Sequence, residues 1–159
     1  MSLSHVDDSG KARMVDVSGK PVSMRTATAS GRVRMSQEAF EAVQKNAVSK
    51  GDVLTVAQVA GITAGKRTGE LIPLCHPLGL DALDVNVALD PDLPGVVVEA
   101  TAKVTGRTGV EMEALTAVAV ACLTVYDMVK AVDRSMVIEQ VQLHSKTGGT
   151  RGDWRSADQ

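Results

Sequence analysis

The sequence predicts an α+β protein in which an antiparallel sheet carries its helices on one face. Several segments alternate apolar and polar residues, which is the period of a strand with one buried face. Other segments place a capping residue before an apolar helical face, and turns rich in glycine and proline separate the two kinds of element. The 159 residues suffice for one domain with a sizeable core.

The ordered part of the chain is expected to begin with two short strands. Residues 13–17 and 22–29 are rich in β-branched side chains and alternate loosely between apolar and polar residues. The sequence Gly19-Lys20-Pro21 between them favours a turn. We therefore predict a strand, a turn and a second strand.

Two helices and a structured loop are expected next. Ser36 can cap a helix that Gly51 ends. Asp52 can cap a second helix, over residues 53–63. The following segment, 65–77, contains two glycines, two prolines, two cations and a histidine. This composition suits a structured loop better than a regular element.

The second half of the chain predicts a hairpin, the longest helix and a last strand. Residues 83–89 and 96–104 both alternate around a turn at 90–95, which is typical of an antiparallel hairpin. The helix is expected over about 110–132. The last strand, 136–143, shifts phase at Glu139-Gln140, which indicates a β-bulge.

The predicted order of elements is ββ, αα, ββ, α, β, which points to an α+β sheet with helices on one face. A ferredoxin-like arrangement fits this order best. We expect residues 1–12 to be a flexible segment, residues 13–146 to be a single domain and residues 147–159 to be a glycine-rich tail.

Composition and charge argue against several classes of function. Three aromatic residues are too few for a protein that stacks bases on several rings. A net charge of −2 gives no basic field that would attract nucleic acid or an anionic membrane. The longest apolar run, 114–125, is too short to span a membrane. Two cysteines without a CxxC pair, and an N-terminus without a secretory signal, favour the cytoplasm.

The long helix is apolar in its middle and charged at both ends. Asp127 and Lys130 have the i, i+3 spacing of a surface ion pair. Because apolar residues flank them, the same pair also suits a functional site, and both interpretations stay open. Glu113 and Asp127 are about 21 Å apart along the helix, too far for one small substrate. A second, antiparallel copy of the helix would bring the two ends together in a dimer, whereas a monomer would simply bury the helix.

The remaining candidate residues are carboxylates, cations and one histidine. Glu111 and Glu113 could each accept two parallel N–H bonds from a guanine-like or pterin edge. His76 lies among other candidates, although a lone histidine is more often structural. Cys75 beside it does not make a metal site, because zinc needs three or four converging ligands, and no metal is expected. Phosphate could bind to basic side chains, most of which are only solvated in any protein: Lys20, Arg25, Lys50, Lys66, Arg67, Lys130 and Lys146.

Six uncommon sequence motifs occur along the chain: Met14-Val-Asp-Val17, Lys66-Arg-Thr68, Glu70-Leu-Ile-Pro-Leu-Cys-His-Pro-Leu78, Gly106-Arg-Thr-Gly-Val-Glu-Met-Glu-Ala-Leu-Thr-Ala-Val118, Leu123-Thr-Val-Tyr-Asp-Met128 and Lys130-Ala-Val-Asp133. Together they resemble the molybdenum cofactor biosynthesis protein C family, the cyclic pyranopterin monophosphate synthases. The resemblance runs from about Leu3 to Gly149, and the tail after Gly149 is atypical of the family.

The resemblance implies an enzyme, a lyase of molybdenum cofactor biosynthesis. Its substrate would be 3′,8-cyclo-7,8-dihydroguanosine 5′-triphosphate, and its products cyclic pyranopterin monophosphate and diphosphate, with no cofactor. The domain at 13–146 would then be catalytic. Its site would lie between subunits of a homohexamer built as a trimer of dimers. The resemblance implies catalytic roles for Lys50, His76, Asp127 and Lys130, and substrate contacts from Leu74, Cys75, His76, Met112 and Glu113.

We assign Lys50 and Lys130 as proton donors and acceptors, with Asp127 setting their charge and position. His76 is assigned as a phosphate binder or secondary acid. Further substrate contacts are expected from Glu111, Lys66, Arg25, Lys20 and Lys146. The alternative function is a non-catalytic ferredoxin-like regulatory module that binds a nucleotide.

Overall fold

The structure is a computed structural model that describes residues 4–157, and this part of the chain forms a five-stranded sheet. The strand order is β2-β3-β1-β4-β5, and every neighbouring pair is antiparallel. The strands are β1 (Ser23–Arg34), β2 (Ala82–Asp90), β3 (Gly95–Gly106), β4 (Val137–Thr147) and β5 (Trp154–Arg155).

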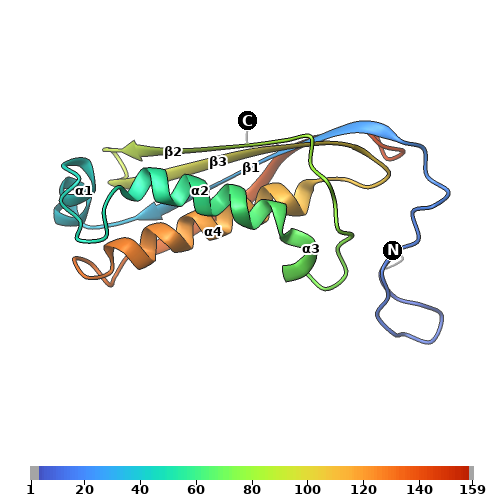
Figure 1. The fold of residues 1–159 in the computed structure, drawn as a ribbon, viewed down its shortest axis with the longest axis horizontal. Helices are drawn as coiled ribbons and strands as arrows, with labels where there is room; N and C mark the ends of the chain where they lie inside the picture. The colour runs from blue at the N-terminus through green and yellow to red at the C-terminus, as the bar shows by residue number, and fades with distance from the viewer. Residues whose placement is uncertain (1–3, 158–159) are drawn as a thin grey trace.

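The helices are α1 (Gln37–Gln44), α2 (Val53–Lys66), α3 (Thr68–Leu71) and α4 (Glu111–Val129). Figure 1 shows α2 and α4 side by side along one face of the sheet, with α1 and α3 toward opposite ends. α4 packs against β1, β3 and β4, whereas α2 packs against α4 and β2. The predicted α+β class, with a ferredoxin-like antiparallel sheet and helices on one face, is confirmed.

The core lies between the sheet and α4. Alternate residues of β1, including Ala27, Ala29 and Val33, are buried toward the helices. Gly31 continues this row, where a Cβ would lie only 2.8 Å from Cγ1 of Val118 on α4. Small residues in β1 therefore let α4 approach the sheet closely. α4 is long and apolar enough to pass for a membrane span, but half of its apolar window is buried, as in a core helix.

Several predicted local features are confirmed. The hydroxyl of Ser36 accepts from the main-chain N–H of Ala39, and the carboxylate of Asp52 accepts from that of Thr55. These bonds satisfy N–H groups that the first helical turn leaves without partners. The hairpin of β2 and β3 forms as predicted. The phase shift in β4 is also confirmed, because its register with β1 shifts and Gln140 has a φ of 54°.

The predicted strand at residues 13–17 is wrong, because these residues lie outside the sheet. β1 is a central strand whose two edges already pair with β3 and β4. No edge of β1 is therefore left for the preceding segment, which runs past the end of the sheet instead.

The predicted loop at residues 65–77 is only partly correct. α2 continues through Gly65 to Lys66, and α3 forms one further turn. Gly65 does not end the helix, since it is buried where α2 crosses α4. A Cβ at this position would collide with Leu83 and lie 3.2 Å from the main-chain oxygen of Glu113. Glycine here serves the close packing of two helices rather than a turn.

The two ends of the chain are described only in part. Residues 4–12 contain turns and one antiparallel bridge, between Val6 and Ala12. Within the predicted tail, β5 pairs with the end of β4. Residues 1–3 and 158–159, which belong to the predicted flexible segment and tail, lie outside the described residues.

Candidate active site

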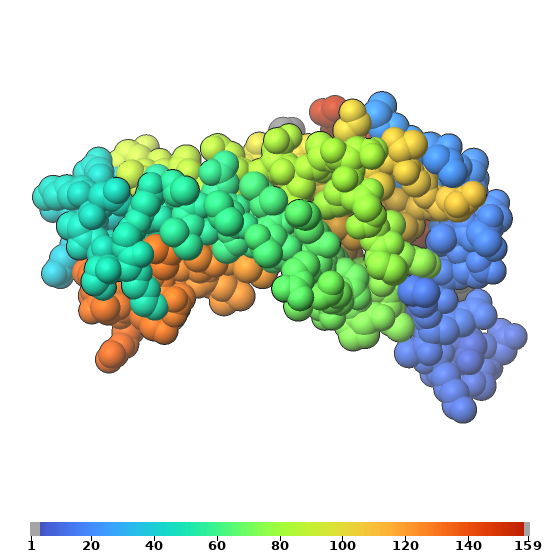
Figure 2. Space-filling view, viewed as in Figure 1, coloured from blue at the N-terminus to red at the C-terminus, as the bar shows by residue number. Residues whose placement is uncertain are grey.

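The predicted site residues form two groups at opposite ends of α4. Asp127 is near the C-terminal end of the helix and Glu113 is near its start, about 21 Å away. Figure 2 shows the turn after α4, in orange, at one end of the molecule and the N-terminal segment, in blue, at the other. One chain thus presents two separate groups of functional side chains.

The first group is an ion triad of Lys50, Asp127 and Lys130. Each ammonium nitrogen lies 2.7 Å from a different carboxylate oxygen of Asp127. Hydrogen bonds from Lys130 and Lys50 lower the pKa of Asp127 to about 2. All three side chains are about half exposed, so the surrounding water screens their attraction. The triad is an accessible cluster with two cations and one anion.

Local sequence explains how the triad forms. Lys130 follows α4 directly, so it reaches Asp127 across one helical turn at i, i+3. Lys50 comes from the loop between α1 and α2, where Gly51 adopts a φ of 99° and Asp52 starts the next helix. The spacing of Asp127 and Lys130 predicts their pair, whereas the contact with Lys50 depends on the tertiary fold.

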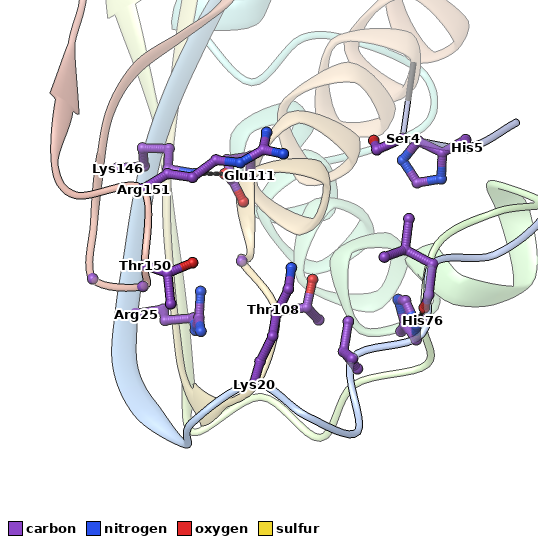
Figure 3. Close-up of a pocket in the computed structure, with 15 residues that line it drawn as sticks. Ser4, His5, Lys20, Arg25, His76, Thr108, Glu111, Lys146, Thr150 and Arg151 are labelled. Carbon is purple, nitrogen blue, oxygen red and sulfur yellow. Dashed lines mark hydrogen bonds and ion pairs between the residues drawn. The ribbon is translucent and has the colours of Figure 1, made fainter. Parts of the chain in front are cut away.

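The second group surrounds a cavity of about 260 Å³ at the opposite end of α4. Figure 3 shows its side chains converging from the N-terminal segment, β1, the loop after β3, the start of α4 and the loop after β4. Four cations and one carboxylate line this cavity: Lys20, Arg25, Lys146, Arg151 and Glu111. The surplus of positive charge suits a polyanion.

Arg25 is the most deeply placed cation of this cavity, since only 7% of it is exposed. Its Nε donates to the main-chain oxygen of Gly106 at 3.1 Å. Its Nη2 is buried without a hydrogen-bond partner among the described residues. A buried donor without a partner is costly, so this guanidinium is well suited to bind an anion that enters the cavity. Lys146 differs, because it already pairs with Glu111 at 2.5 Å.

His76 lies on the other side of the cavity. Its Nε2 contacts the main-chain oxygen of Val15 at 2.6 Å. Because a carbonyl oxygen can only accept, Nε2 must carry the proton of this bond. Nδ1 remains available for a ligand. The segment predicted as a strand therefore has another role, since it orients the imidazole.

A smaller cavity of about 140 Å³ adjoins the first. Leu74, Cys75, Met112 and Glu113 line it together with His76 and Glu111. Glu113 is only 4% exposed, and burial raises its pKa to about 7, with a further contribution from the charge of Glu111. Burial, followed by the charge of Glu113, also raises the pKa of Cys75.

Lys66 lines a third cavity, of about 70 Å³, which Glu113 also lines. Glu113 thus borders two cavities, whereas Lys66 lies apart from the cations around Arg25. Residues 4–157 contain no group of three or more histidine, cysteine or acidic side chains placed to hold a metal ion.

The structure brings ten of the predicted site residues to the cavity end of α4 and three to the triad. It also places Thr108, Thr150 and Arg151 in the large cavity, which the sequence did not predict. The only sequence signal for the last two was their position after the Gly148-Gly149 pair, which is typical of a tight loop.

Comparison with known proteins gives a consistent family. The sequence model of the MoaC family matches residues 14–149. A curated relative from Parvibaculum lavamentivorans is 54% identical over 97% of this chain and 96% of its own length. Relatives from Cereibacter sphaeroides and a Nocardioides species are 56% and 58% identical, over 98% and 96% of this chain and 98% and 94% of their own lengths. All three carry the name cyclic pyranopterin monophosphate synthase. The predicted resemblance is confirmed, and the chain belongs to the MoaC family.

Proposed function

We propose that this protein is a cyclic pyranopterin monophosphate synthase. The observation that carries this function is the shared name of curated relatives at 54–58% identity over nearly the whole chain. Its substrate would be 3′,8-cyclo-7,8-dihydroguanosine 5′-triphosphate, which unites a guanine-like edge with a triphosphate. The products would be cyclic pyranopterin monophosphate and diphosphate.

The two adjoining cavities match the two parts of this substrate. The large cavity offers unpaired guanidinium N–H groups and ammonium groups to the triphosphate. The smaller cavity offers Glu113 to the guanine-like edge, whose parallel N–H groups a carboxylate accepts. Such a bond would favour the ionised form of Glu113, against the effect of burial.

We place the Lys50, Asp127 and Lys130 triad of a second chain against these cavities. The roughly 21 Å between Glu113 and Asp127 prevents one chain from supplying both groups to one substrate. An isologous dimer with antiparallel α4 helices would complete two equivalent sites. We therefore expect an oligomer built from such dimers, and we propose a homohexamer that is a trimer of dimers. We also propose that the protein acts in the cytoplasm.

In this arrangement Lys50 and Lys130 transfer protons while the purine ring opens and the pterin ring closes. The pKa of Asp127 is about 2, so its carboxylate is ionised at neutral pH and fixes the position and charge of both lysines. When the ring carries a second proton, on Nδ1, His76 donates this N–H to a phosphate or acts as a secondary acid, while its Nε2–H stays bonded to the carbonyl of Val15.

Turnover tests the proposal. The purified protein should convert the cyclised triphosphate into equal amounts of cyclic pyranopterin monophosphate and diphosphate, measured by mass spectrometry and a diphosphate assay. Asp127→Ala should abolish this conversion. Tight binding of the precursor without release of diphosphate would instead support the alternative, a non-catalytic nucleotide-binding module.

Light scattering tests the assembly. A mass that is a multiple of the dimer supports the shared site, because each site then has a second chain to complete it. An active monomer at the working concentration of the assay would contradict it.

A further inference from the structure

The loop that follows β4 forms one wall of the large cavity. Gly148, Gly149, Thr150 and Arg151 line it, opposite the side on which His76 lies. The family match ends at Gly149, so Thr150 and Arg151 lie beyond the segment that the family model describes. Their placement in the cavity comes from this structure alone.

Specific contacts hold the loop in this position. Gly148, Gly149 and Gly152 have φ values of 83°, 88° and 73°, which glycine adopts without strain. The main-chain N–H of Gly148 donates to the carboxylate of Asp153 at 3.0 Å. Just beyond the loop, β5 pairs with β4. The loop is therefore closed by hydrogen bonds at both ends.

The loop also packs directly on the buried guanidinium of Arg25. A Cβ at Gly149 would collide with Nη1 of Arg25, and a φ of 88° would strain any residue other than glycine at this position. The next two residues extend from this point along the cavity wall. Figure 3 shows the side chain of Arg151 directed toward Glu111, with Lys146 on the same wall.

Arg151 differs from Lys146 in its pairing. Lys146 is bound to Glu111, whereas Arg151 forms no ion pair or side-chain hydrogen bond within residues 4–157. Its side chain is exposed at the cavity, and its guanidinium can bind two phosphate oxygens in parallel. The geometry thus places an accessible, forked cation beside the deeper Arg25.

We propose that Arg151 is a substrate-binding residue that binds the terminal two phosphates of the substrate, the part released as diphosphate. The proposal rests on the proposed function for the identity of the substrate. A hydroxyl oxygen of the substrate bonds to the α-phosphorus and closes the cyclic phosphate, while the bond from the α-phosphorus to the oxygen that bridges to the β-phosphate breaks. The two terminal phosphates leave together as diphosphate with that oxygen, and the hydroxyl proton passes to Lys50 or Lys130, the proton acceptors proposed above. Arg151 holds this leaving group at the outer wall, while Arg25 binds deeper in the cavity.

Titration of inorganic diphosphate into the whole protein tests the proposal without turnover. Arg151→Ala should weaken diphosphate binding about tenfold, the scale of a lost charged hydrogen bond, and Arg151→Lys should recover only part of it. Arg155→Ala is the matched control, because it removes the same charge from β5, outside the cavity. It should bind diphosphate as the unaltered protein does.

Steady-state kinetics provides the second readout. Arg151→Ala should raise KM for the triphosphate more than it lowers kcat, with the same thermal midpoint as Arg155→Ala. Diphosphate affinity equal in the Arg151→Ala, Arg155→Ala and unaltered proteins would overturn the proposal, as would no diphosphate binding by the unaltered protein. Failure of the unaltered protein to convert the precursor would instead overturn the proposed function, so the two failures are distinguishable.

Discussion

Lys50 binds both the side chain and the main chain of Asp127, with its Nζ 2.7 Å from Oδ2 and 3.2 Å from the carbonyl oxygen. This carbonyl belongs to the last turn of α4, where main-chain oxygens lack partners within the helix. A single ammonium group therefore fixes the loop between α1 and α2 to the end of α4. Lys130 completes the arrangement from the other carboxylate oxygen.

Replacement of the two lysines by arginine should separate charge from proton transfer. Arginine keeps the positive charge but is effectively never deprotonated. We expect Lys50→Arg and Lys130→Arg to bind the precursor within about tenfold of the unaltered protein. Their turnover should fall on the order of a hundredfold or more, the scale of a lost general acid or base.

Lys45→Arg is the control for this experiment, because Lys45 is exposed and its only ion pair within residues 4–157 is with Glu41. It should leave turnover unchanged. Near-normal turnover in Lys50→Arg and Lys130→Arg would show that the lysines supply charge only. Crystal structures with the precursor bound would establish whether the larger guanidinium displaces it.

The carboxylate of Asp127 should stabilise the fold at pH values above the pKa that Asp127 has in the unfolded chain. This stabilisation should be lost in acid. Its pKa is 3.8 ordinarily and about 2 in the fold, so the folded state binds fewer protons between these values. The unfolding free energy of the unaltered protein should exceed that of Asp127→Asn at pH 6. The difference should shrink as the pH falls from about 4 to about 2. Denaturant titrations across this range measure it, and a difference that persists unchanged at pH 2 contradicts the assignment.

Glu113 should have the opposite effect on stability. Burial raises its pKa from 4.5 to about 7, so the folded state binds more protons in this interval. The stability of the unaltered protein should therefore decrease relative to Glu113→Gln as the pH rises from about 5 to about 7. Denaturant titrations of both proteins at several pH values measure the change. Parallel stability curves would show that the carboxylate is not buried in solution.

Subunit exchange should reveal whether the two ends of α4 serve one site. Inactive Glu113→Ala and Asp127→Ala proteins, mixed and exchanged, should recover about a quarter of the original activity, because half of the dimers are mixed and each has one intact site. The matched control mixes Asp127→Ala with Lys130→Ala. Both changes lie in the same triad, so every site stays defective and the mixture should stay inactive. Equal recovery in both mixtures, or in neither, would contradict a site shared in this way.

The features that were predicted correctly from the sequence are local ones, which depend on residues close together in the chain. Capping by Ser36 and Asp52 and the β2–β3 hairpin follow from local patterns, and the structure has them. The strand at 13–17 was wrong because its pattern says nothing about whether a sheet edge is available. The role of that segment, holding His76 through Val15, needs a contact between residues 61 positions apart.

The sequence indicated which residues could form a candidate site, but not how they are grouped in space. The spacing along α4 indicated that Glu113 and Asp127 are too far apart for one substrate. Spacing gave no information on the contact between Lys50 and Asp127, which are 77 positions apart. Arg151 was missed because a single cation in a glycine-rich tail has no pattern that distinguishes it from a solvated residue.

The crossing of α2 and α4 at Gly65 has a mechanical consequence for the cavities. Here a Cβ on residue 65 would collide with the side chain of Leu83 and lie 3.2 Å from the main-chain oxygen of Glu113. Directly after this crossing the chain carries Lys66, α3 and the loop with His76. The position of these residues therefore depends on how closely α2 approaches α4 at Gly65. A methyl group at position 65 would therefore push α2 away from α4 beside Glu113.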